Sequence, residues 1–128
     1  MAALQPLTPE MVTFLTEYHL ASLTTMRADG SPHVVPVGFS YDQESHTVRV
    51  ITFDSSVKYK NALRGGRAAV SQVDGGRWLT LEGTVSGTAD PDRVALAVEG
   101  YTARYRKPGD REGRVAIEIA VDRIMGRV

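Results

Sequence analysis

The stretch TVRVITFDSSVKYKNALRGGR, residues 47–67, predicts a strand that turns directly into a helix and carries a local excess of positive charge. Its first seven residues alternate in the manner of a strand with one buried face. The residues SVKYKNALR that follow have helical character, and Gly65 and Gly66 form a suitable helix C-cap. The most informative feature of the chain is therefore a strand-to-helix turn.

The charge of this turn differs from that of the chain as a whole. The protein has 15 Lys and Arg and 15 Asp and Glu residues, so its formal net charge is zero. No acidic residue occurs in residues 55–73. The basic residues of the same stretch are Lys58, Lys60, Arg64 and Arg67.

A helix N-terminus offers free backbone N–H groups and a partial positive charge, which together suit a phosphate. Ser55 and Ser56 add hydroxyl groups at this end of the predicted helix. We call residues 52–67 the basic elbow and expect it to bind an anionic group. Charge pattern alone supports a solvent-exposed surface helix equally well, because surface helices commonly carry Lys and Arg.

The rest of the chain predicts two more helices and five more strands. Both helices begin at a capping residue followed by Pro, at Thr8 and at Asp90. We expect the first helix to reach about His19 and the second to end at residues 107–109. The predicted strands are LASLTTMR, HVVPVGFSY, RAAVSQV, WLTLEGTVSGTA and RVAIEIAV. Six short strands joined mainly by tight turns favour a closed or nearly closed antiparallel barrel, in one domain over residues 1–128.

Two places in these strands call for an explanation. Pro36 and Gly38 lie inside HVVPVGFSY, where Pro removes a ladder donor and Gly offers no side chain to pack. Two interpretations are open. The segment lets a flat ligand lie against the backbone, or it is an edge strand with a bulge. Trp78, the only tryptophan, follows Arg77 at the start of a strand and can stack on a planar ring, although a single Trp more often belongs to the core.

Composition excludes several kinds of chemistry. Without cysteine there is no disulfide, no thiolate nucleophile and no thiolate metal site, which fits a reducing cytoplasmic location. The first 14 residues have neither a basic region nor a long apolar run, so we expect neither a signal peptide nor a membrane anchor. Zero net charge argues against binding to nucleic acid or to a membrane surface. The three histidines are scattered, so we predict no metal site, and no side-chain constellation predicts a catalytic residue.

Three long pieces of the sequence carry a family resemblance. They are LASLTTMRADGSPHVVPVGFSYD, RVITFDSSVKYKNALRGGRAAVSQVDG and RWLTLEGTV. In this order and spacing they resemble the pyridoxamine-phosphate-oxidase-like split-barrel proteins, which bind flavins or the deazaflavin coenzyme F420. The chain is most similar to the F420-dependent subgroup that includes biliverdin reductases. The resemblance implies a mainly β (α+β) fold, a six-stranded antiparallel split barrel with short flanking helices.

The resemblance also implies a cofactor site. It places the cofactor phosphate at Ser56 and Lys58 and the ring near Trp78. The surplus of bases in the elbow suits the long anionic tail of the deazaflavin, which favours coenzyme F420 over FMN. The full expected set is Pro36, Val37, Gly38, Ile51, Thr52, Ser55, Ser56, Lys58, Lys60, Asn61, Arg64, Arg67, Arg77, Trp78 and Leu79. Family members typically form homodimers with the cofactor at the interface, and Arg77 is our candidate for a residue given by the other chain.

The implied function is an F420H2-dependent reductase that transfers a hydride to a conjugated electrophilic substrate. Biliverdin is the substrate implied by the subgroup, and cations are needed for its propionates. The candidates are Arg77, Arg104, Arg106 and Lys107. Two alternatives remain open: an FMN-dependent oxidoreductase of the same fold, and a non-enzymatic protein that binds a cofactor or a tetrapyrrole.

Overall fold

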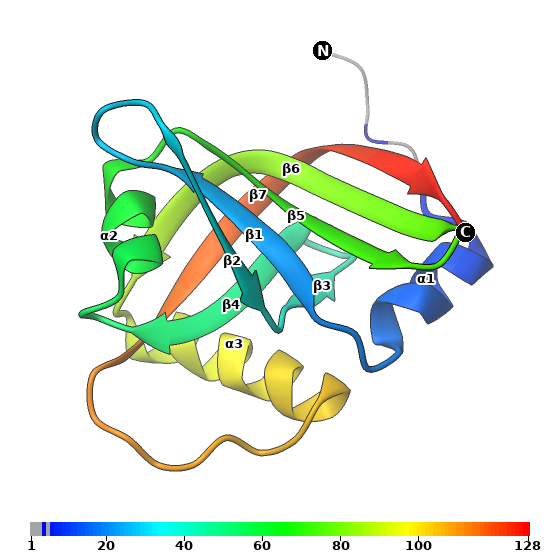
Figure 1. Cartoon of the computed structure of the whole chain (residues 1–128). Coiled ribbons are helices and arrows are strands. Elements are labelled where there is room, and N and C mark those ends of the chain that lie inside the picture. The colour runs from blue at the N-terminus through cyan, green and yellow to red at the C-terminus, as the bar shows by residue number, and fades with distance from the viewer. Residues whose placement is uncertain (1–3, 5) are drawn as a thin grey trace.

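The computed structural model describes residues 4 and 6–128, which form one curled antiparallel sheet flanked by helices (Figure 1). In chain order the elements are α1 (Pro9–Thr16), β1 (Ala21–Met26), β2 (Pro32–Val37), β3 (Ser40–Asp42), β4 (Thr47–Phe53), α2 (Val57–Arg64), β5 (Arg67–Asp74), β6 (Arg77–Thr88), α3 (Pro91–Arg104) and β7 (Arg114–Arg127). Helices α1 and α3 have the predicted N-caps, Thr8 and Asp90, and α2 is capped by Ser56; each cap side chain accepts a hydrogen bond from a backbone N–H of the first turn. None of the described helices is long and apolar enough to span a bilayer.

The strand order is β2-β1-β5-β6-β7-β4-β3, so the two edge strands, β2 and β3, follow each other in the chain. Residues 38 and 39 carry the chain from one edge of the sheet to the other. Since β2 pairs only with β1 and β3 only with β4, no ladder of hydrogen bonds joins the two edges. The barrel is therefore open along this seam, which only the chain itself bridges.

This topology confirms the predicted mainly β antiparallel fold but gives seven strands in the described residues, where six were expected. The difference lies in HVVPVGFSY, which divides at Gly38 into β2 and β3. The first half pairs with β1 and the second half with β4, so the two halves lie at opposite edges of the sheet. The interruptions at Pro36 and Gly38 therefore mark the seam rather than a bulge in one strand.

Several predicted element ends also differ. Helix α3 ends at Arg104, before the expected residues 107–109. Helix α1 ends at Thr16, short of His19, because Glu17 is extended at φ −67° and ψ 155°. The carbonyl groups of Glu17 and His19 accept hydrogen bonds from side chains at the end of α3, which replace further helical bonds. Strand β7 continues to Arg127, beyond the predicted RVAIEIAV, because it pairs along nearly the whole of β6.

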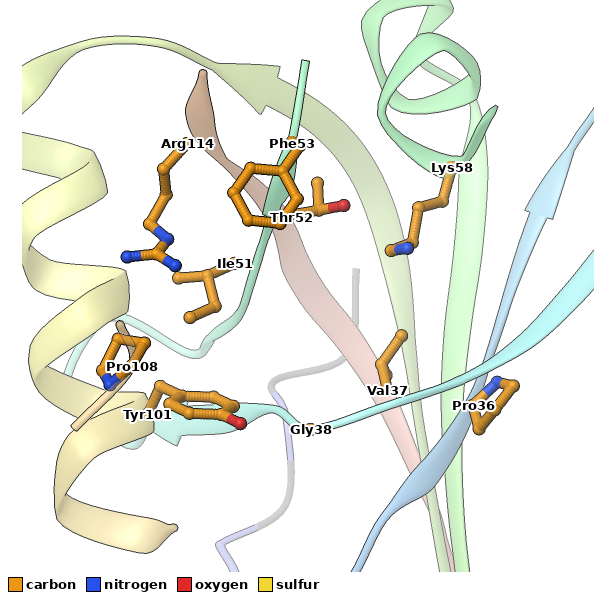
Figure 2. Close-up of a pocket in the computed structure, with 10 residues that line it drawn as sticks. All are labelled: Pro36, Val37, Gly38, Ile51, Thr52, Phe53, Lys58, Tyr101, Pro108 and Arg114. Atoms are coloured by element: carbon orange, nitrogen blue, oxygen red, sulfur yellow. The ribbon is translucent and has the colours of Figure 1, made fainter. Parts of the chain in front are cut away.

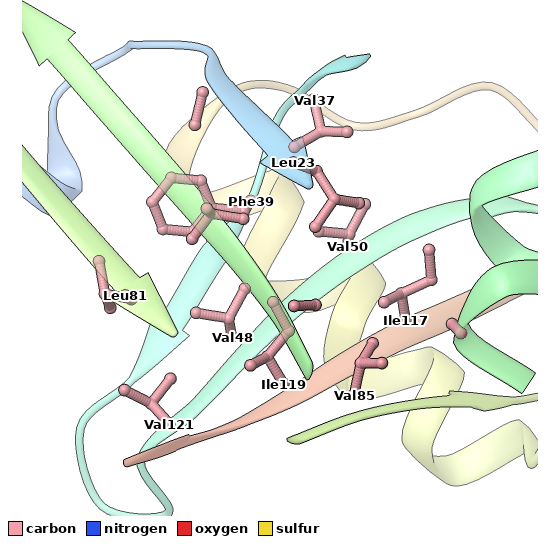
Figure 3. Packing of buried hydrophobic residues seen from close by; sticks show 14 of the residues in the cluster. Leu23, Val37, Phe39, Val48, Val50, Leu81, Val85, Ile117, Ile119 and Val121 are labelled. Atoms are coloured by element: carbon pink, nitrogen blue, oxygen red, sulfur yellow. The ribbon is translucent and has the colours of Figure 1, made fainter. Parts of the chain in front are cut away.

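The core lies inside the curled sheet. Strand β4 alternates strictly, with Val48 and Val50 buried and Arg49 and Ile51 partly exposed on the opposite face. The core residues labelled in Figure 3 are Leu23, Val37, Phe39, Val48, Val50, Leu81, Val85, Ile117, Ile119 and Val121. Helix α3 covers the outer face of β4 and β3, while α2 packs on β6 beside the end of β4 (Figure 1). The seam, the end of β4 and the start of α2 are thus brought to one side of the barrel.

The bulge that curls β6 against β7 depends on a glycine. The register of the β6–β7 pairing shifts between Glu82 and Gly83. A Cβ added at Gly83 would lie 1.9 Å from the carbonyl oxygen of Ala120. Gly83→Ala is expected to lower the free energy of unfolding by about 2–3 kcal/mol, because the backbone must move to accept the methyl group. Urea denaturation measures this loss. Gly76→Ala is the matched control, since an added Cβ there meets no atom within 4 Å; equal midpoints for the two variants would contradict the account.

Candidate functional site

A cavity of about 280 Å³ opens beside the seam, between the end of β4, the start of α2, α3 and the loop that follows α3 (Figure 2). Its lining residues are Pro36, Val37, Gly38, Ile51, Thr52, Phe53, Lys58, Tyr101, Pro108 and Arg114. The walls are mainly apolar and include two cations but no carboxylate. Mainly apolar walls with a few placed polar groups are the usual composition of a small-molecule site.

The structure brings six of the fifteen sequence-predicted residues to this cavity: Pro36, Val37, Gly38, Ile51, Thr52 and Lys58. They come from three elements that are separate in sequence and meet only because β2, β4 and α2 converge at the seam. Figure 2 shows Lys58 reaching toward the cavity from α2, with Arg114 on the opposite side.

Gly38 allows two tyrosines to pack against the backbone at the edge of the cavity. A Cβ at this position would lie 3.0 Å from a ring carbon of Tyr101 and 3.0 Å from a ring carbon of Tyr105. The Tyr105 hydroxyl donates to the carbonyl of His19 at 2.7 Å and accepts from the N–H of Phe39 at 3.2 Å. Burial raises the pKa of Tyr105 above its ordinary value, so the hydroxyl remains a donor at neutral pH. The chain at the seam is therefore held in one position.

Arg104 fixes the same region through neutral acceptors. Its guanidinium donates to the carbonyls of Glu17 at 2.9 Å and Phe39 at 3.0 Å, and also to the side-chain oxygen of Gln72. Gln72 is fully buried and donates in turn to the carbonyl of Phe14 at 2.8 Å. Arg104 is thus fully engaged in joining α3 to the barrel and does not line the cavity.

The first turn of the basic elbow has the geometry of an anion site. The Thr52 hydroxyl donates to Ser56 Oγ at 3.0 Å, and Ser56 Oγ accepts from the N–H of Tyr59 as the helix cap. Lys58 is half-buried, and no described carboxylate oxygen lies within 4.0 Å of its ammonium group. Its charge is therefore available to a ligand. Ser55 is exposed and does not line the cavity.

The remaining polar residues of the elbow are bound elsewhere. Asn61 is only 3% exposed and donates to Thr25 Oγ1 at 3.0 Å, and Arg64 donates to Asn61 and to the carbonyl of Met26. Arg67 forms a two-pronged pair with Asp122 across the sheet. These contacts attach α2 and β5 to the barrel. Lys60 is exposed and does not line the cavity, so Lys58 is the one described base of the elbow that does.

Three predicted residues on β6 also lie away from the cavity of their own chain. Arg77 pairs with Asp74 and Glu17 and stacks on the Phe14 ring at 4.6 Å. Leu79 is fully buried in the core, and Trp78 is 36% exposed on the outer face of the sheet. Within one chain none of the three reaches the cavity lining.

Sequence reasoning missed four lining residues: Phe53, Tyr101, Pro108 and Arg114. Arg114 pairs with Phe53 at the end of the β4–β7 ladder. The two residues are 61 positions apart in sequence, so no local pattern predicts that they meet. Tyr101 lies in α3 and reaches the cavity only through the packing of that helix beside Gly38. One feature of the sequence could have indicated Arg114: it is the first residue of a strand, as Arg77 is.

Comparison with known proteins agrees with this geometry. The sequence profile of the family described as "Pyridoxamine 5'-phosphate oxidase" matches residues 7–127. The chain is 50% identical over 120 residues to the F420H(2)-dependent biliverdin reductase of Mycobacterium tuberculosis (strain CDC 1551 / Oshkosh), covering 94% of this chain and 88% of that protein.

Two further matches are more distant. A 5a,11a-dehydrotetracycline/5a,11a-dehydrooxytetracycline reductase of Streptomyces rimosus subsp. rimosus (strain ATCC 10970 / DSM 40260 / JCM 4667 / NRRL 2234) is 31% identical, over 85% of this chain and 70% of that protein. A solved structure described as an F420 reductase superposes with a TM-score of 0.72 at 25% identity, over 94% of this chain and 98% of that one. Because the family profile spans nearly all of the sequence and the folds agree, the chain belongs to the pyridoxamine 5'-phosphate oxidase family.

Proposed function

We propose that the protein is a coenzyme F420-dependent oxidoreductase that reduces a conjugated, electrophilic substrate, with biliverdin as the first candidate. The observation that carries the proposal is the cavity itself, which has apolar walls beside cations that lack acidic partners. It occurs in a chain that is 50% identical to an F420H(2)-dependent biliverdin reductase. A planar ring joined to an anionic tail is the kind of molecule that such a site accommodates.

The residues present fit the coenzyme. Lys58 would hold its phosphate, because its ammonium has no acidic partner and it lies in the first turn of α2, where the helix N-terminus carries a partial positive charge. The backbone at Pro36 and Gly38, with Ile51 and Thr52 across the cavity, would hold the ring. When bound, the reduced coenzyme supplies a hydride to the substrate.

The chain itself contributes binding, orientation and electrostatics. The cavity lining has no carboxylate and no imidazole, and its hydroxyl groups belong to Thr52 and Tyr101. We therefore assign no acid–base residue and attribute the chain's effect to holding ring and substrate close together, away from bulk water. The cytoplasmic location that we propose rests on the absence of cysteine.

The activity is tested under anaerobic conditions by adding biliverdin to the protein and reduced coenzyme F420. We expect continuous, enzyme-dependent oxidation of the coenzyme, followed by its returning fluorescence. Binding of biliverdin without turnover would indicate a sequestering protein instead. Turnover with reduced FMN and no response to the deazaflavin would overturn the cofactor assignment.

We further propose a homodimer that uses the outer face of β1, β5 and β6. Ser22, Ser71 and Thr80 lie side by side across these strands, with Thr24, Ala69 and Glu82 in the next row, where Glu82 pairs with Arg123. The small side chains make this face flat, and exposed apolar residues surround it: Met26, Val34, Val73, Trp78 and Met125. Such a face is suited to close packing against a second copy. Its position beside the exposed Trp78 supports a contribution of that residue to the partner's cavity.

Ser71→Arg places a long cation at the centre of this face and is expected to convert the dimer to a monomer. Light scattering after size-exclusion chromatography measures the mass. Thr102→Arg, on the exposed side of α3, is the control and should leave the mass unchanged. A wild-type protein that is monomeric at high concentration, or a Ser71→Arg variant that stays dimeric, would refute the proposal.

A further inference from the structure

Two arginines share one aromatic ring on the side of the cavity opposite Lys58. Cζ of Arg111 lies 4.0 Å from the centroid of the Phe53 ring, and Cζ of Arg114 lies 5.5 Å from the same centroid. Arg114 is half-buried and lines the cavity, whereas Arg111 is exposed on the loop between α3 and β7. The N–H of Asp54 donates to the carbonyl of Gly113 at 2.9 Å, which attaches this loop to the end of β4.

These two arginines differ from most others in the described part of the chain, because no acceptor is present for them. The arginines paired with carboxylates are Arg49, Arg67, Arg77, Arg93 and Arg123. No described carboxylate lies within 4.0 Å of Arg111 or Arg114, and the buried Nε of Arg114 has no hydrogen-bond partner. A buried donor without an acceptor is unfavourable, so a ligand acceptor at this place would be bound strongly.

The chemistry of a guanidinium indicates which ligand. A guanidinium next to an aromatic ring keeps its N–H edge free, and this edge matches the two oxygens of a carboxylate. In Figure 2 Phe53 and Thr52 lie between Arg114 and Lys58, with the apolar side chains of Ile51 and Val37 below them. A molecule that fills the middle of the cavity therefore has a separate cation on each side.

We propose that Arg114, assisted by Arg111, is the subsite that recognises a carboxylate of the substrate, and that it is separate from the phosphate anchor at Lys58. The inference rests on the proposed function and narrows the substrate class to conjugated molecules with pendant carboxylates. It also replaces the candidates expected from the sequence. Arg77 and Arg104 are occupied by other partners, and Arg106 and Lys107 are exposed and do not line the cavity.

The test compares biliverdin with its dimethyl ester, in which both carboxylates are replaced by neutral methyl esters. Binding to the full chain is measured from the absorbance of the bound pigment. The wild type should bind the free acid about tenfold or more tightly than the ester, the scale of a charge-assisted hydrogen-bond pair. Arg114→Gln should remove this preference by weakening only the free acid. Arg111→Gln should cause a smaller loss of about threefold, because the side chain is exposed.

Two further variants separate position from charge. Arg106→Gln removes the same charge from an exposed site and should change biliverdin affinity by less than about twofold. Arg114→Lys keeps the charge without the planar fork and should restore part of the preference for the free acid. Circular dichroism melting curves verify that each variant is folded.

Several outcomes would overturn the inference. These are equal wild-type affinity for acid and ester, equal losses in Arg106→Gln and Arg114→Gln, or no binding of either ligand to the wild type. The coenzyme's own tail is another source of carboxylates, so F420 is titrated into Arg114→Gln as well. A loss of F420 affinity with unchanged biliverdin affinity would assign the subsite to the coenzyme. Acid preference without any oxidation of the coenzyme would leave this inference standing while the proposed activity fails.

Discussion

The position of the cavity depends on the hydrogen bonds that Arg104 and Tyr105 make to Phe39. The two edges of the sheet are joined only by residues 38 and 39, without a ladder across the seam. Arg104 donates to the Phe39 carbonyl, while Tyr105 accepts from the Phe39 N–H. Both backbone groups at the seam are thereby satisfied by side chains at the end of α3. Burial lowers the pKa of Arg104 from its very high ordinary value, and its three neutral acceptors compensate for the lost hydration.

This arrangement explains why an edge of the sheet can serve as a binding surface. An open edge exposes unpaired backbone groups and invites association with other strands. Here α3 fixes the chain at Gly38 while leaving the backbone beside it open to the cavity. The site therefore combines a rigid backbone wall with the end of a strand and the start of a helix, and this rigidity favours precise placement of a ring.

The basic residues divide into two groups that the sequence alone does not distinguish. Arg64 and Arg67 lie in the basic elbow, yet their partners are Met26 and Asp122, which are 38 and 55 positions away in sequence. They hold the helix and the sheet together. Lys58 and Arg114 line the cavity without an acidic partner. Their positive charges are therefore available to a ligand in the cavity.

Local sequence was enough for the caps of α1 and α3 and for most strands, because caps, alternation and glycine turns act over a few positions. The six predicted residues that line the cavity came as a set from the family resemblance. Local sequence did not predict the division of HVVPVGFSY into two strands, because this division depends on the strand with which each half pairs. The same holds for Arg114 and Tyr101, which reach the cavity through the β4–β7 register and the packing of α3. The number of bases in the elbow suggested that it binds the anionic tail of the deazaflavin, but only Lys58 among them lines the cavity.

The central claim is that the basic elbow binds the coenzyme through one lysine rather than through its overall charge. A fluorescence titration of coenzyme F420 into the wild type, Lys58→Ala and Lys60→Ala tests this directly, because the two variants remove equal charge from one helix. We expect Lys58→Ala to weaken binding by about 1–3 kcal/mol, the usual scale for a charge-assisted hydrogen bond. Lys60→Ala, at an exposed position, should bind as the wild type does. Unchanged affinity in Lys58→Ala, or an equal loss in both variants, would contradict the account.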